Sequence, residues 1–151
     1  MTRPGVATKQ IQPRAKGVAK IRHAIGRTTY EGITVEGHCI GIQARTWRIP
    51  PQAANYEFAS DAAKAVVKAG KMRPIKVDAQ GNPIGKLPRG ALIWWYTGAN
   101  KEPGHVATIA GKKGHACIGN IGREIKRVPI RAIHYTLVGW SYPGDVPGWV
   151  K

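Results

Sequence analysis

Residues 104–120 read Gly-His-Val-Ala-Thr-Ile-Ala-Gly-Lys-Lys-Gly-His-Ala-Cys-Ile-Gly-Asn, which is the pattern of a β-hairpin. Small and β-branched residues alternate from His105 onward, a Gly-Lys-Lys-Gly turn follows at 111–114, and a returning strand is predicted at 115–119. His105 comes directly after a Pro-Gly turn, so the hairpin places this side chain at its open end. We expect a histidine in that place to interact with a side chain from a distant part of the sequence, and the best candidate is Cys39.

Cys39 is predicted to lie in the first turn of a helix. Four of the residues that follow share one helical side: Ile40, Gln43, Ala44 and Trp47. The segment ends at 49–51, Ile-Pro-Pro, because proline does not continue a helix. Free backbone N–H groups and the positive end of the helix dipole stabilise a thiolate at such a position. Most cysteines are buried structural residues, but the Gly-rich approach and the helix start favour a reactive thiol at Cys39.

Two further helices are predicted from apolar spacing. The first covers 15–25, where Val18, Ile21 and Ile25 fall on one face. The second covers 60–69, with Ser60 or Asp61 as its cap and Gly70 as its end. Its buried stripe is expected to consist of four residues: Ala62, Ala65, Val66 and Ala69.

The strands are expected in the second half of the chain. Residues 91–96, Ala-Leu-Ile-Trp-Trp-Tyr, are apolar on both faces, which predicts a central strand with core packing for at least one of the tryptophans. Short strands are also expected at 126–128 and 136–140, with a helical turn at 129–133 and an irregular stretch at 71–90. The prediction is therefore an α+β fold, with N-terminal helices packed on a mostly antiparallel sheet of about four to six strands.

The composition indicates a large surplus of positive charge. The 151 residues include 24 Lys and Arg against 8 Asp and Glu, which gives a formal net charge of +16. That charge predicts attraction to polyanions such as nucleic acid, an anionic membrane or an acidic bacterial wall. Residues 1–30 hold seven basic residues and no acid, so we expect a basic N-terminal arm with a short helix, followed by a single domain over 31–151.

Other classes are disfavoured by what the sequence lacks. No stretch approaches 18 apolar residues, so no membrane span is expected, and the N-terminal residues lack the apolar core of a signal peptide. Two cysteines are too few for a disulfide scaffold, and we expect Cys39 and Cys117 to be free thiols. We also expect a monomer without a cofactor.

Three features in this order resemble the papain-like cell-wall cysteine hydrolases of the CHAP and NlpC type, and most closely the small phage endolysin domains. They are Cys39 opening a helix, Gly-His-Val-Ala at 104–107, and Asn120 at the end of the next strand. The segments 87–95, 130–133 and 137–141 are similar to the flanking strands of that group, and the resemblance covers roughly 33–142. The sequence departs from the family at His38, where a small or polar residue is more usual.

The resemblance implies a papain-like fold with a thiol mechanism in the domain over 31–151. Cys39 would be the nucleophile, His105 the base, and Asn120 the residue that orients the imidazole, with His115 as an alternative third residue. The implied substrate is an amide bond of peptidoglycan, either in the stem peptide or between muramic acid and alanine. The implied enzyme is made in a host cytoplasm without a signal peptide and acts at the wall as a phage lysin or a virion component, where its basic surface would adhere to acidic wall polymers.

Two other functions remain open from the residues alone. His115 and Cys117 lie two positions apart and would face the same side of a strand, so with His105 they would give a zinc amidase. The net charge of +16 and the basic arm also suit a non-enzymatic nucleic-acid-binding protein, although no RNA-binding motif is present.

Overall fold

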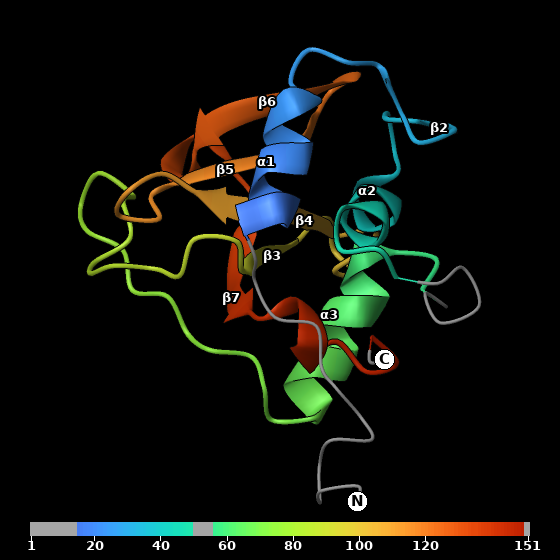
Figure 1. Ribbon diagram of the computed structural model, residues 1–151. Helices are drawn as coiled ribbons and strands as arrows, with labels where there is room; N and C mark the ends of the chain where they lie inside the picture. The colour runs from blue at the N-terminus through green and yellow to red at the C-terminus, as the bar shows by residue number, and fades with distance from the viewer. Residues whose placement is uncertain (1–14, 50–55, 150–151) are drawn as a thin grey trace, which may run out of the picture.

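Three helices and a five-stranded antiparallel sheet dominate the part of the chain that the computed structural model describes, residues 15–49 and 56–149 (Figure 1). The helices are α1 (Ala15–His23), α2 (Cys39–Thr46) and α3 (Ala59–Lys68). The sheet has the strand order β6-β5-β4-β3-β7, with β3 (Leu92–Tyr96), β4 (His105–Ala110), β5 (Ala116–Ile121), β6 (Glu124–Pro129) and β7 (Thr136–Ser141). A two-stranded ribbon of β1 (Thr29–Tyr30) and β2 (Ile33–Thr34) and two short 3₁₀ turns, η1 (Ile130–Ala132) and η2 (Pro143–Asp145), complete the described elements. The predicted α+β class is confirmed, and no helix among these residues is long and apolar enough to cross a membrane.

The hairpin predicted at 104–120 is confirmed as β4 and β5. The strands pair antiparallel with Ile109 opposite Cys117. Gly111 and Gly114 have φ angles of +86° and +71°, which L side chains rarely adopt, so the two glycines allow the tight turn. The returning strand begins one residue later than predicted and continues to Ile121.

The sheet is covered on both faces, as the apolar run at 91–96 predicts. Trp94 packs in one core cluster with helices α2 and α3, whereas Trp95 packs in a cluster on the opposite face with Leu87 and Ile130. Both tryptophans are almost fully buried. β3 lies between β4 and β7, and this central place explains why successive residues of the strand are all apolar.

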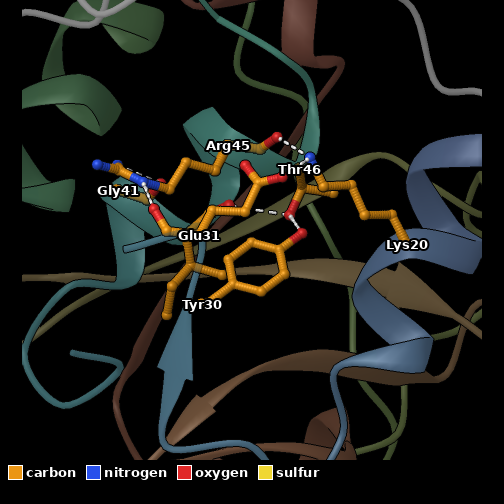
Figure 2. A network of polar contacts seen from close by, with 7 residues as sticks. Lys20, Tyr30, Glu31, Gly41, Arg45 and Thr46 are labelled. Atoms are coloured by element: carbon orange, nitrogen blue, oxygen red, sulfur yellow. Dashed lines mark hydrogen bonds and ion pairs between the residues drawn. The ribbon is translucent and has the colours of Figure 1, made fainter. Parts of the chain in front are cut away.

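Helix α1 packs on the sheet because Ile21 of the helix, and Ala24 just after it, share a core cluster with Ile118 and Ile125. A polar network then ties α1 to β1, to the turn that follows β1 and to α2 (Figure 2). Lys20 of α1 donates a hydrogen bond from Nζ to the Arg45 carbonyl at 2.8 Å and forms an ion pair with Glu31 at 2.7 Å. The Tyr30 and Thr46 hydroxyls are 3.0 Å apart in the same network. A cation at the last turn of α2 also complements the helix dipole, so the network fixes the helix that begins at Cys39.

Helix α3 differs from its prediction at the start. The cap is Phe58 and not Ser60 or Asp61, because Asp61 accepts a hydrogen bond from the Phe58 N–H at 3.3 Å and Ser60 donates its own N–H to the Pro103 carbonyl at 3.0 Å. The buried face also differs from the predicted stripe, since Ala65 is half-buried and Ala69 is exposed. The observed buried residues are Ala59, Ser60, Ala62, Ala63 and Val66. Gly70 ends the helix with a φ of +72°, as predicted.

Candidate active site

Cys39 is the first residue of α2, at the end of a turn that passes through Gly37 with a φ of +77°. His38, the residue before it, is exposed, and its Nδ1 lies 2.7 Å from the Thr34 carbonyl oxygen. No side chain caps the helix, so its first N–H groups point toward the site without a competing carboxylate or hydroxyl. The thiol contacts the carbonyl oxygen of Gly104 at 3.9 Å, which places the sulfur directly against the residue before His105.

His105 is the first residue of β4, and the residue is only 8% exposed. The Trp95 ring is its neighbour across the strands, with the two centroids 5.3 Å apart, and the Tyr135 ring lies 6.2 Å away on another side. Burial among these rings disfavours the imidazolium and lowers the pKa of His105 from 6.5 to about 4. The imidazole is therefore neutral at pH 7, which is the form that accepts a proton.

The thiol of Cys39 is also held in its neutral form. Burial raises its pKa above the ordinary value, and the backbone N–H groups of Val106, Ile40 and Cys39 itself oppose that rise by stabilising the thiolate. These N–H groups come from the start of α2 and from β4, so they surround the sulfur from two sides. The cavity is therefore lined by a neutral thiol and a neutral imidazole, with no thiolate–imidazolium pair.

The loop before His105 is held by contacts to two other segments. The Gly104 N–H donates to the Thr97 hydroxyl at 2.9 Å. A Cβ at this position would lie 2.5 Å from the backbone nitrogen of Ser60, and its φ is +74°, so only glycine fits. The start of α3 and the end of β3 thereby fix where β4 begins.

One cavity of about 440 Å³ brings the three predicted residues together. Cys39, His105 and Asn120 all line it, and they come from α2, β4 and β5. Nε2 of His105 and Oδ1 of Asn120 are both buried without a hydrogen-bond partner among the described residues. One is a potential donor and the other an acceptor, so their needs are complementary. His115 lies at the other end of the hairpin, with its Nε2 2.7 Å from the Gly85 carbonyl oxygen, and does not line this cavity.

The cavity also contains residues that the sequence did not single out. Glu57 and Glu102 line it, and none of its lining residues is Lys or Arg, although the chain as a whole carries a charge of +16. Phe58 and Tyr135 add two partly exposed aromatic rings, 36% and 54% exposed. A second hollow of about 300 Å³ shares Gly37, Ile40 and Glu57 with the first, continues along α2 and includes Arg45 in its lining. For Phe58 and Tyr135 the sequence offers one signal, because each is an aromatic residue just before a predicted helix or strand. For Glu57 and Glu102 it offers none.

The alternative zinc ligands do not come together. Cys117 of β5 is fully buried in the core cluster that contains Trp95 and Ile130, and burial raises the pKa of its thiol to about 12. His115 is turned toward Gly85 at the hairpin turn. Within 15–49 and 56–149, no three His, Cys, Asp or Glu side chains gather in a metal-binding group. Both cysteines are free thiols, as expected.

Comparisons with known proteins find no family model, no curated protein and no solved structure that matches the chain. The chemistry of the residues around the cavity therefore carries the functional conclusion.

Proposed function

We propose that this chain is a cysteine hydrolase of the papain-like type that cleaves an amide bond of peptidoglycan. The observation that supports it most directly is the single cavity lined by Cys39, His105 and Asn120. Cys39 and His105 are 66 positions apart in sequence, and Asn120 lies on a third element. A thiol at a helix start, a neutral buried imidazole and an amide oxygen in need of a donor are the parts that thiol-dependent acyl transfer uses.

The reaction begins when the imidazole of His105 takes the proton of the Cys39 thiol. The thiolate then attacks the substrate carbonyl carbon, a C–S bond forms, and the carbonyl oxygen becomes an oxyanion near the N–H groups at the start of α2. The oxyanion collapses, the C–N bond breaks, and His105 returns the proton to the leaving amine. Water, deprotonated by the same imidazole, hydrolyses the thioester, and the thiol is restored.

The thiol of Cys39 donates toward the Gly104 carbonyl and shares no hydrogen bond with the imidazole of His105. Catalytic hydrogen bonds are often long before substrate binds and shorten in the complex. A rotation of the Cys39 side chain away from Gly104 would serve this purpose, and pairing of Nε2 with the Asn120 oxygen would set the tautomer that leaves Nδ1 free as the base. Burial of both groups strengthens these interactions once they form.

The substrate assignment follows from the resemblance and the shape of the site. The two adjoining hollows, of about 440 and 300 Å³, suit an extended chain and not a small metabolite. The +16 charge suits contact with an acidic bacterial wall. The scissile bond is either in the stem peptide or between muramic acid and alanine, and the enzyme acts at the wall as a phage lysin or a virion component.

Amine release from purified peptidoglycan tests the proposal. Cys39→Ala is expected to lower the rate of amine release by at least about a thousandfold, because the nucleophile and its base act as one unit. Cys117→Ala is the matched control, since it removes the other thiol of the chain, which does not line the cavity, and is expected to retain activity. A chelator is expected to have no effect.

Three results would contradict the proposal. Equal activity of the Cys39→Ala variant would remove the thiol mechanism. Loss of activity with a chelator would point to a metal site instead. Lack of amine release across several wall types by the wild-type protein would favour a binding protein.

A further inference from the structure

A basic hollow lies at the turn end of the β4–β5 hairpin, away from the candidate active site. It has a volume of about 450 Å³. Its cations come from the turn, from β6 and from η1: Lys112, Lys113, Arg127 and Arg131. We refer to these four residues as the turn cluster. No acidic residue lines the hollow, and its other polar side chains are those of Asn82 and His115.

The turn cluster is not neutralised from within the described part of the chain. None of its four members takes part in an ion pair there, whereas two other cations of the β5–β6 hairpin do. Arg123 pairs with Glu36 at 3.1 Å, and Lys126 pairs with Glu124 at 3.5 Å. Like charges gathered around one hollow repel one another, and a bound polyanion removes that repulsion.

The backbone under the turn cluster is fixed by short contacts. The Gly114 N–H donates to the Gly111 carbonyl at 3.2 Å, and the Leu87 N–H donates to the Lys113 carbonyl at 3.0 Å. A Cβ at Gly111 would lie 3.3 Å from the guanidinium of Arg127, so this cation lies directly over the turn. A site that is already ordered loses less entropy when it binds a ligand.

We propose that the turn cluster binds the phosphates of an anionic wall polymer whose repeating units are joined by phosphodiesters and carry no bases. Lys and Arg together provide charge and forked hydrogen-bond donors for phosphate oxygens. No Phe, Tyr or Trp lines the hollow, so it lacks the stacking platform with which proteins hold single-stranded nucleic acid.

The turn cluster lies far enough from the cavity that a polymer bound there would leave the cavity accessible to substrate. His105 opens β4 and Lys112 follows its far end, seven positions later, which corresponds to roughly 20 Å of extended strand. The polymer would therefore hold the protein at one end of the hairpin while the substrate peptide enters at the other. The choice of a wall polymer as ligand rests on the proposed function. Binding at the turn cluster does not require Cys39, so a failure of binding is distinguishable from a failure of hydrolysis.

The test measures binding of purified poly(glycerol phosphate) to the full chain as a function of salt. The quadruple variant Lys112→Gln, Lys113→Gln, Arg127→Gln and Arg131→Gln is compared with a control quadruple that lowers the net charge equally. The control changes four exposed residues that form no ion pair with another described residue, each to Gln: Lys16, Arg22, Lys68 and Lys71. Loss of the turn cluster is expected to weaken binding at least about tenfold near 0.15 M salt and to reduce the slope of log K against log salt by roughly 3 units. The control quadruple is expected to keep most of the affinity.

Other outcomes would overturn the inference. Equal loss in both quadruple variants would mean that net charge and not the turn cluster holds the polymer. Single-stranded DNA of equal phosphate number that binds more tightly, and through the same four residues, would make the site a nucleic-acid site. No binding of the polymer by the wild-type protein near 0.15 M salt would also refute it. Matching thermal unfolding of the three proteins shows that the variants are folded.

Discussion

Replacement of His105 by Gln tests the central electrostatic feature of the site, a histidine held neutral by burial. The pKa of His105 is lowered from 6.5 to about 4 in the folded chain, whereas in the unfolded chain it has its ordinary value. Between these two values the unfolded state binds a proton that the folded state does not bind. The free energy of unfolding therefore falls as the pH is lowered through this window. The expected contribution is about 2 kcal/mol lost between pH 7 and pH 5, and about 3 kcal/mol lost by pH 4.

Urea denaturation of the wild type and His105→Gln, at half-unit steps from pH 8 to pH 4, measures this contribution. Glutamine does not titrate, so the difference between the two unfolding free energies isolates the histidine from the carboxylates, which change equally in both proteins. The two curves are expected to run parallel above pH 7, where the variant shows only its constant packing cost, and to converge or cross at lower pH. Curves that stay parallel down to pH 4 would refute the reasoning, because the imidazole would then gain its proton as readily in the folded chain as in the unfolded one.

Three further outcomes follow from the same structure. The buried imidazole predicts that kcat/KM on a soluble wall peptide falls as the pH drops through about 4, and a midpoint near 6.5 would show a solvated base. Gly104→Ala is expected to lower the free energy of unfolding, measured by urea denaturation, by about 2 to 4 kcal/mol, because the new Cβ meets the backbone of Ser60 and the φ angle is positive. Gly122→Ala is the control for backbone strain alone, since Gly122 also has a positive φ but open space around it. The control is expected to lower the free energy of unfolding clearly less. Thr108→Val removes the 2.6 Å hydrogen bond to the buried amide oxygen of Gln43 and is expected to cost about 1 to 3 kcal/mol by the same assay, with no change in the slope against urea.

The elements with strong local periodicity were predictable from the sequence. The hairpin at 104–120, the central strand at 91–96 and the helix start at Cys39 follow from alternation, apolar runs and turn residues that act within a few positions. The start of α3 was not predictable, because the Ser60 N–H is satisfied by the Pro103 carbonyl, more than 40 positions away. Tertiary contacts of this kind override local capping preferences.

The candidate site was predictable in its residues but not in its electrostatics. Cys39, His105 and Asn120 could be chosen from their places in three elements, and the cavity brings those three together. The lowered pKa of His105 depends on Trp95 across the strands and on Tyr135 from the approach to β7, and no local pattern encodes that convergence.

Acidic and basic residues line different hollows of the described part of the chain, and this separation relates wall binding to catalysis. An enzyme that adheres to a polyanion through a net charge of +16 risks drawing the polymer into its own active site. Here the lining of the cavity carries Glu57 and Glu102 as its only Asp, Glu, Lys or Arg residues, whereas the hollow at the hairpin turn carries four Lys or Arg and no acid. Glu102 forms an ion pair with Lys64 at 3.6 Å, so the repulsion of phosphates at the cavity comes mainly from Glu57, whereas the turn cluster attracts them. If wall binding and catalysis are combined in this chain, Glu57→Lys with Glu102→Lys should leave binding of poly(glycerol phosphate) as tight or tighter. The same polymer should then inhibit amine release more strongly than in the wild type, whereas unchanged inhibition would show that the acids do not guard the cavity.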